Sequence, residues 1–355
     1  MLLNLVACGA GDGTKRELPP GEQTSAPPGD TVLYVSEGQG NRVVSYRVGT
    51  DGLLNGAPFS SIDLQNPRKL LLNGNVLFVA LEDRIVSIVL GSDGSLPTQP
   101  TSVTDPVFEG NPLDMVLVDD VLYAAFENVL SILAYRLDRG QLAAFPLTIS
   151  GTNFSEYRAI ASANGFVYAT SPRSGTIDTY VIGPAGALPE TPDSELPDKD
   201  IDFPEDLLIN DGILYLIDAF DRRIKVFPIQ SNGLLPNEPT TETKRVESYV
   251  RALIDDTLLY ASAYNEGRID LYRLDPVDGN LVDDKPLAFT ENDTGAFPIG
   301  LVLVNGVMYV TQAGRGRIDG YLVNSDGTLP PFPSTSTIAL DGSFPNDIVS
   351  GSFPP

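Results

Sequence analysis

Charged side chains recur at matched places in this sequence, where they could bind a substrate or activate water. Each stands one or two residues after a proline or tyrosine that opens an apolar segment: Arg68, Lys69, Asp114, Arg158, Glu205, Asp206, Arg251 and Asp347. Arginines could hold an anionic substrate through paired hydrogen bonds while a carboxylate acts as general base. Alternatively, opposite charges on neighbouring segments neutralise each other and keep the segments in register. This second interpretation is the simpler one, because structural ion-pair networks imitate functional clusters.

The composition excludes several classes of protein. The 355 residues contain no histidine, so a Ser-His-Asp triad, a His-ligated metal site and an imidazole pH switch are all ruled out. The 23 Lys and Arg against 47 Asp and Glu give a formal net charge of −24, which repels nucleic-acid phosphate. We therefore expect no nucleic-acid partner and assign no catalytic residue from the sequence.

A second set of candidate residues lies in polar segments further along each repeat, and it is mostly acidic: Glu37, Glu82, Asp83, Glu127, Arg173, Asp218, Asp221, Tyr264, Glu266 and Arg315. Carboxylates from several loops can bind Ca²⁺, which prefers six to eight oxygen ligands. The sequence has no Asp-x-Asp-x-Asp-Gly loop. We therefore predict no cofactor, with Ca²⁺ as the open alternative.

The elements that must position these charges repeat along the chain. An aromatic residue inside a short apolar run recurs seven times, 44 to 49 residues apart, at Tyr34, Phe78, Tyr123, Tyr168, Tyr215, Tyr260 and Tyr309. Eleven residues before every one except the first stands a proline or tyrosine, namely Pro67, Pro112, Tyr157, Pro204, Tyr249 and Pro298. A period of this length predicts a propeller or another repeat array.

The segments of one repeat read as four strands. A turn joins the first two, at Asn73-Gly74, Asp119-Asp120, Asn164-Gly165, Asp211-Gly212, Asp255-Asp256 and Asn305-Gly306. The first repeat lacks its opening strand, and residues 344–349 supply a spare copy at the C-terminal end. We therefore predict an all-β, seven-bladed β-propeller with four antiparallel strands per blade, closed where the C-terminal strand pairs with the N-terminal blade.

The repeat also resembles a known family. Residues 309–322, Tyr-Val-Thr-Gln-Ala-Gly-Arg-Gly-Arg-Ile-Asp-Gly-Tyr-Leu, followed by Ser325-Asp326-Gly327-Thr328-Leu329, are similar to the repeat of lactonase-type, or YVTN, β-propellers, and the same cadence covers all seven blades. The resemblance implies the seven-bladed fold and, for some members, 6-phosphogluconolactonase-like or muconate-cyclising activity. Muconate-type members are thought to use His, Arg and Glu in the central mouth, and this chain lacks the His.

The start of the chain predicts its location. Leu5-Val6-Ala7-Cys8 looks like a bacterial lipobox, in which the single cysteine becomes lipidated. Only seven residues precede Cys8, so residues 1–8 form a partial signal. Residues 9–30 are rich in Gly, Pro and polar residues and read as a flexible tether. We expect the propeller to occupy residues 31–355 of an extracytoplasmic lipoprotein, attached to a membrane through Cys8 alone.

Two functions follow from these observations. The main one is a lipid-anchored interaction or scaffold module that offers its loop face to a protein partner or a membrane-associated complex. The alternative is a lactonase-like hydrolase that acts on an anionic small molecule at the mouth of the central channel, around the eight charged residues named first.

Overall fold

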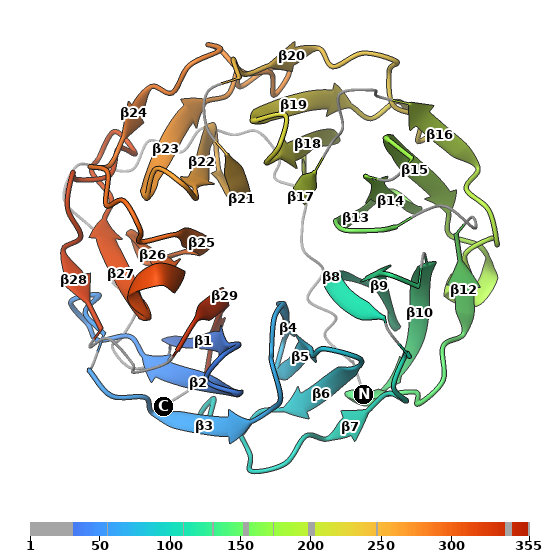
Figure 1. The fold of residues 1–355 in the computed structure, drawn as a ribbon, viewed down its shortest axis with the longest axis horizontal. Coiled ribbons are helices and arrows are strands. Elements are labelled where there is room, and N and C mark those ends of the chain that lie inside the picture. Colours follow the sequence, from blue (N-terminus) through green and yellow to red (C-terminus); the bar gives the residue numbers. More distant parts are fainter. Residues whose placement is uncertain are drawn as a thin grey trace, which may run out of the picture.

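The repeats fold as seven sheets arranged in a ring around a central axis (Figure 1). The computed structural model describes residues 31–54, 56–108, 110–129, 131–151, 156–172, 174–197, 203–245, 248–337 and 343–353. The described part is all-β, and the predicted seven-bladed propeller is confirmed. Cys8 and the proposed tether lie outside the described residues, so the lipid anchor stays a prediction.

Each blade consists of four antiparallel strands, which follow one another from the channel outwards. Blade 1 contains β29 (Pro345–Ser352), β1 (Thr31–Glu37), β2 (Arg42–Arg47) and β3 (Ser60–Asp63). Blade 2 contains β4 (Leu70–Asn73), β5 (Val76–Ala80), β6 (Ile85–Val89) and β7 (Ser102–Val103). Blade 3 contains β8 (Asn111–Val118), β9 (Val121–Glu127), β10 (Ser131–Asp138) and β12 (Thr148–Ser150), and the short β11 (Gln141–Leu142) also pairs with β10.

The remaining four blades follow the same plan. Blade 4 contains β13 (Ile160–Ala163), β14 (Phe166–Ser171), β15 (Thr176–Val181) and β16 (Ser194–Pro197). Blade 5 contains β17 (Pro204–Asn210), β18 (Ile213–Asp218), β19 (Arg223–Pro228) and β20 (Thr241–Glu242). Blade 6 contains β21 (Tyr249–Asp255), β22 (Leu258–Ala263), β23 (Arg268–Arg273) and β24 (Ala288–Phe289). Blade 7 contains β25 (Pro298–Val304), β26 (Val307–Gln312), β27 (Arg317–Leu322) and β28 (Thr335–Ser336).

The ring closes through the C-terminal strand, as predicted. β29 pairs antiparallel with β1, which places Val349 opposite Tyr34 and Ile348 opposite Val35. The ring of Phe353 packs edge-on against the ring of Tyr34, with 6.2 Å between centroids. Closure leaves β1 with a strand on each side, so it is no longer a free sheet edge.

Buried tyrosines lock each blade to the next. In six blades the hydroxyl of the recurring aromatic residue donates to a glycine carbonyl in the following blade, in the pairs Tyr34–Gly94, Tyr123–Gly186, Tyr168–Gly233, Tyr215–Gly279, Tyr260–Gly327 and Tyr309–Gly52. In blade 2 the aromatic residue is Phe78, and Ser87, opposite it on β6, donates to Gly140 at 2.6 Å instead. The apolar core is likewise shared between adjacent blades.

The predicted positions of two hairpin turns need correction. Four of the six lie as predicted, but the turns in blades 2 and 6 begin one residue later, since Asn73 pairs with Val76 and Asp255 pairs with Leu258. The first turn residue adopts a positive φ, which is +58° at Gly74 and +52° at Asp256. Inward-facing apolar residues set the register, and the turn forms wherever that register ends.

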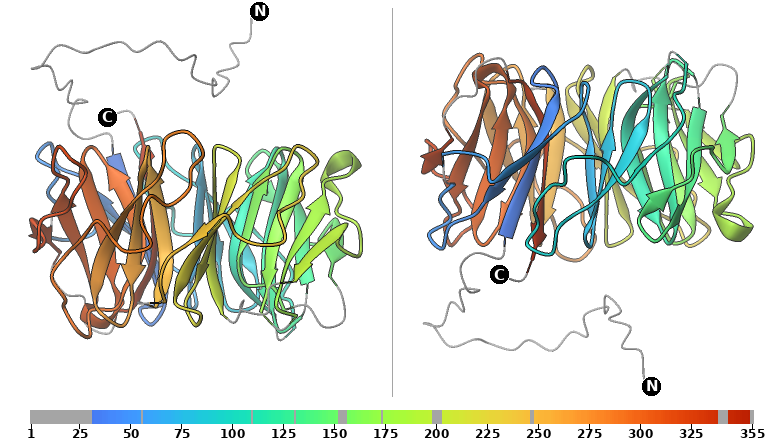
Figure 2. Two further views of the ribbon diagram at one scale, coloured as in Figure 1. Left: turned by 90° about the horizontal axis from the view of Figure 1, so that it is seen from above. Right: turned by 90° about the horizontal axis from the view of Figure 1, so that it is seen from below.

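The two faces of the disc differ (Figure 2). The inner strands begin at one face, which we call the mouth face. The inner strand β29 begins with Pro345 at the mouth face and ends with Ser352 at the opposite face. Thr31 pairs with Ser352, so both described ends of the chain lie at the face opposite the mouth. The described residues form two short 3-10 helices, Pro184–Gly186 and Ala313–Arg315, and among them no helix has the length and apolar character to span a membrane.

Candidate functional site

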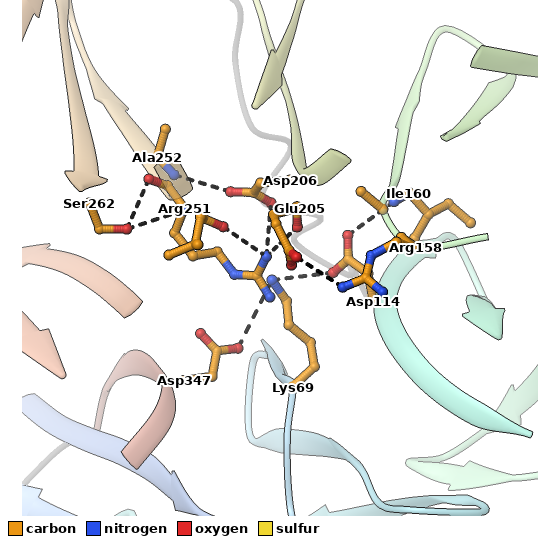
Figure 3. A network of polar contacts seen from close by, with 12 residues as sticks. Lys69, Asp114, Arg158, Ile160, Glu205, Asp206, Arg251, Ala252, Ser262 and Asp347 are labelled. Atoms are coloured by element: carbon orange, nitrogen blue, oxygen red, sulfur yellow. Dashed lines mark hydrogen bonds and ion pairs between the residues drawn. The ribbon is translucent and has the colours of Figure 1, made fainter. Parts of the chain in front are cut away.

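The eight charged residues predicted for the channel mouth all lie where the inner strands begin, seven of them drawn in Figure 3. Arg68, Lys69 and Arg158 come just before their strands. The others lie on the inner strands themselves, namely Asp114 on β8, Glu205 and Asp206 on β17, Arg251 on β21 and Asp347 on β29. The topology therefore brings residues from six blades to one end of the channel.

Three of the carboxylates bind the backbone of the next blade. Asp347 accepts a hydrogen bond from the N–H of Leu70 at 2.9 Å, Asp114 from Ile160 at 3.0 Å and Asp206 from Ala252 at 3.2 Å. These aspartates stand on blades 1, 3 and 5, and their donors on blades 2, 4 and 6. Such buried charge-assisted bonds fix the register of neighbouring blades.

Blades that supply an aspartate alternate with blades that supply the backbone N–H donor. With seven blades this alternation leaves one blade over, and blade 7 has no charged residue at this position. At the matching position it carries Gly300. A Cβ there would lie 3.0 Å from the nitrogen of Ile348 and 3.1 Å from the Cα of Asp347, so the contact with blade 1 leaves little room for a side chain. The preceding residue, Ile299, is apolar. The ring of charge therefore has one uncharged side.

Two cations lie among these carboxylates. The Nζ atom of Lys69 lies 3.2 Å from Asp114 and 4.0 Å from Asp347, and Nη1 of Arg251 lies 3.9 Å from Asp206. Burial and the nearby Arg251 lower the pKa of the Lys69 amine, but the surrounding aspartates outweigh them and hold it above its ordinary value. Burial raises the pKa of Asp206, although Arg251 and Lys69 oppose that shift.

A second ion-pair group borders the first. Arg158 donates to Glu127 at 3.0 Å and to Glu205 at 2.9 Å, and its guanidinium lies 4.1 Å from the centre of the Phe203 ring. The carbonyl of Glu205 accepts a hydrogen bond from Arg251. Glu205 is thus held between the two arginines, with one carboxylate oxygen, Oε2, that makes no hydrogen bond within the described part of the chain.

A cavity of about 380 Å³ opens at the mouth above these groups. Six of the predicted residues line it: Arg68, Lys69, Arg158, Glu205, Arg251 and Asp347. Asp114 and Asp206 are each 4% exposed and do not line it. Within the described ranges the Arg68 guanidinium has no ion pair or hydrogen bond, so its charge is available to a ligand.

The second, mostly acidic set is largely engaged in local pairs. Glu37 binds Arg42, Asp83 binds Arg84, and Asp221 lies 3.3 Å from Lys225. Across the described residues there is no cluster of three or more His, Cys, Asp or Glu side chains arranged to hold a metal ion. Arg173 falls outside the described residues.

A larger cavity lies between blades 2 and 3 and shares no lining residue with the one at the mouth. Its volume is about 1020 Å³, and Glu82, Asp83 and Arg84 contribute its charged wall. Two hydrogen bonds, of 2.7 and 2.8 Å, already join Asp83 to Arg84. Unlike the mouth, this cavity has no set of cations that converge on it.

Sequence reasoning missed two aromatic residues at the mouth. Phe203 and Phe220 line a further cavity of about 420 Å³, which adjoins the one at the mouth. Phe203 directly precedes Pro204, so extending the search one residue before each proline or tyrosine would have found it. Phe220 lies in the loop between β18 and β19, and no repeated signal marks it.

Comparison with known proteins places this fold. No family model and no curated protein sequence matches the chain. Among solved structures, the periplasmic gluconolactonase of Pseudomonas aeruginosa superposes with a TM-score of 0.78 at 16% identity, over 92% of this chain and 99% of that one. A putative 6-phosphogluconolactonase from Bacteroides uniformis gives a TM-score of 0.76 at 18% identity, over 91% and 100%. Another from Bacteroides fragilis gives 0.75 at 15%, over 94% and 100%.

The likeness is one of fold. It confirms the predicted structural resemblance to lactonase-type seven-bladed propellers. The main functional expectation from the sequence, an interaction or scaffold module, is wrong: these structural neighbours are described as lactonases, which favours the alternative. From the sequence we had preferred to interpret the arginines and carboxylates of the mouth as structural ion pairs between blades.

Proposed function

We propose that this protein is a lactonase-type hydrolase that opens the ring of an anionic lactone at the channel mouth. The observation that carries the proposal is the 380 Å³ cavity, into which Arg68, Lys69, Arg158 and Arg251 converge around Glu205. A pocket of this size suits a small molecule, and guanidinium groups suit a carboxylate or phosphate substituent. The names of the structural neighbours support the same reaction class.

Glu205 is the best placed general base. Its Oε1 is bound by Arg158, and Oε2 can accept a proton from water. The oxygen of that water attacks the lactone carbonyl carbon, and the carbonyl electron pair moves onto oxygen, where Arg158 and Arg251 stabilise the negative charge. When the carbonyl re-forms, the ring C–O bond breaks and the departing oxygen takes the proton from Glu205. One lactone and one water give one hydroxy acid.

Asp347 is less suited to this role. Its Oδ2 accepts the N–H of Leu70 and lies 4.0 Å from Lys69, so it is engaged in holding blade 2. Among the residues that the structure describes, the Glu205 side chain makes no such bond to the next blade, and it also lines the adjoining cavity. A change at Glu205 should therefore affect the chemistry more than the fold.

The proposal is tested with a panel of lactones, whose hydrolysis is measured in a pH-stat through the acid that it releases. The panel pairs lactones that bear a carboxylate or phosphate with neutral analogues. We expect turnover of the anionic members and a fall in kcat of at least about 100-fold in Glu205→Gln, as for loss of a general base. Glu195→Gln, on the outer strand β16, is the matched control. Absence of turnover by the unchanged protein on the whole panel would refute the proposal.

We also propose an extracytoplasmic location with lipid attachment at Cys8. The lipobox-like Leu5-Val6-Ala7-Cys8 supports it, as does the periplasmic location in the name of one structural neighbour. Since Thr31 lies at the face opposite the mouth, attachment upstream of it is compatible with an accessible mouth. Fatty-acid labelling of cells that express the protein tests this, and label that persists in Cys8→Ser would contradict it.

A further inference from the structure

The mouth cavity continues into a second cavity of different chemistry. The two share Glu205, Arg251 and Ile299, so a molecule of modest size can occupy both. The second cavity, of about 420 Å³, has six apolar or aromatic residues among its ten: Phe203, Ala219, Phe220, Val250, Tyr264 and Ile299. A charged cavity thus lies directly beside an apolar one.

The apolar residues of this cavity come from blades 5, 6 and 7. Blades 1 to 6 present charged side chains at the mouth, and blade 7 presents Ile299. Tyr264 is held in place by stacking on Phe297, with 4.8 Å between ring centroids and 18° between ring planes. Phe203 lies under the guanidinium of Arg158. Aromatic side chains of blades 5 and 6 therefore form a wall beside Ile299 of blade 7.

Aromatic surface is left open to solvent there. Phe220 is 68% exposed and Phe203 is 42% exposed. Covering apolar surface is favourable in free energy because it removes that surface from water. An apolar group seated against these rings would gain that free energy while its anionic substituent remains at the cationic mouth.

Two polar residues of the second cavity, Ser248 and Arg251, are already engaged with backbone carbonyls. Ser248 donates its hydroxyl to the carbonyl of Ala219 at 2.9 Å, and Arg251 donates to the carbonyls of Glu205 and Val250. A sugar ring carries several hydroxyl groups, and those that face Phe203, Phe220 and Val250 would lose water without gaining a partner. Unsatisfied buried polar groups oppose binding, so this cavity disfavours a polyhydroxylated ring.

We infer that the two cavities form one bipartite site, whose ligand is an anionic molecule with a planar apolar substituent such as a phenyl group. The anion binds at Arg68 and Lys69, and the planar group lies against Phe203, Phe220 and Tyr264. If the proposed function holds, the substrates are aryl-substituted anionic lactones. The structural neighbours, in contrast, are named after sugar lactones.

Binding can be measured separately from catalysis by titration calorimetry with two carboxylates that contain no lactone ring. The probes are 3-phenylpropanoate and gluconate. We expect 3-phenylpropanoate to bind at least about tenfold more tightly. Phe220→Ala should weaken its binding about tenfold and leave gluconate unchanged, whereas Arg68→Ala should weaken both. Phe332→Ala, equally exposed in the connection between β27 and β28, is the matched control and should change neither.

The outcomes separate the two claims. Equal or tighter binding of gluconate, no binding of either probe, or no effect of Phe220→Ala would overturn the bipartite site. A second measurement compares hydrolysis of γ-butyrolactones that carry a carboxylate with and without a phenyl group. If 3-phenylpropanoate binds as expected but no lactone is hydrolysed, the proposed function fails and the ligand class stands. If only the lactone without the phenyl group is hydrolysed, the function stands and the inference fails.

Discussion

Arg68 and Arg251 carry the same charge at the same mouth, but their surroundings give them different roles. Arg251 lies near Asp206 and donates to two backbone carbonyls, whereas Arg68 has no such partner in the described part of the chain. Removing Arg251 would leave the buried Asp206 without its nearest cation, which typically costs about 3–5 kcal/mol. Loss of activity in an Arg251 variant would therefore mix binding with stability.

Arg68→Ala is the cleaner test of anion binding. We expect KM for anionic lactones to rise about tenfold or more, equivalent to about 1.4 kcal/mol, with little change in kcat. The melting temperature should stay within about 1 °C, because the guanidinium makes no ion pair or hydrogen bond with the described residues. Kinetics and thermal unfolding check this, with Arg273→Ala, exposed on β23, as control. A neutral lactone affected as strongly as an anionic one would contradict the assignment.

The hydrogen bond from a strand hydroxyl to a glycine carbonyl of the next blade, which we call the blade-to-blade lock, connects a strand with a turn. Each lock joins a strand of one blade to the glycine turn of the next, and the glycines have φ values such as +80° at Gly233 and +82° at Gly140. Such values are strained for residues with a side chain. The repeated glycine in the turn and the repeated tyrosine in the strand therefore serve one interaction.

Tyr168→Phe should measure the strength of one lock. The hydroxyl donates to the buried carbonyl of Gly233 at 2.9 Å, and its removal leaves that carbonyl without this donor. We expect a loss of about 1–3 kcal/mol in the free energy of unfolding, measured with urea. Ser87→Ala should cost a similar amount, since Ser87 replaces the missing hydroxyl in blade 2. Ser131→Ala, whose bond to Val129 is local, should change stability by less than about 0.5 kcal/mol.

At the scale of the molecule, stability depends on closing the ring. Deleting residues 343–355 removes β29 and exposes the edge of β1, together with the apolar surface that Ile348 and Phe353 cover. We expect the melting temperature to fall by at least about 10 °C, with increased aggregation. A synthetic peptide of residues 343–353 added in excess should restore part of the loss. A truncated protein as stable as the full chain would show that β29 is dispensable.

The buried tyrosines of the blades should also determine the pH at which the protein unfolds in alkaline solution. Burial raises the pKa of Tyr123, Tyr168, Tyr215 and Tyr260 to about 12. Their contribution to stability is complete below the ordinary tyrosine pKa of about 10 and is lost as pH rises towards 12. With no tryptophan in the chain, absorbance at 295 nm reports tyrosinate directly. We expect these tyrosines to ionise together with the loss of the β-sheet circular dichroism signal; ionisation in a fully folded protein at pH 10 would contradict this.

The sequence by itself determined the repeat, the number of blades and the strand that closes the ring. It also placed the charged residues at one end of the channel. These features follow from local patterns, because alternating apolar residues, turn residues and their spacing are recorded within each 45-residue unit. Even so, the turns in blades 2 and 6 were placed one residue early, because pairing across the hairpin decides the register.

Only the tertiary structure decided how those charges are used. Asp347 and Leu70 are 277 residues apart, and nothing local indicates that one binds the backbone of the other while Arg68, two residues before Leu70, remains available. The aromatic cavity beside the mouth is likewise built from residues of three blades. Pairing and cavities depend on which side chains from distant segments fill the same space, and that is settled only when the blades pack.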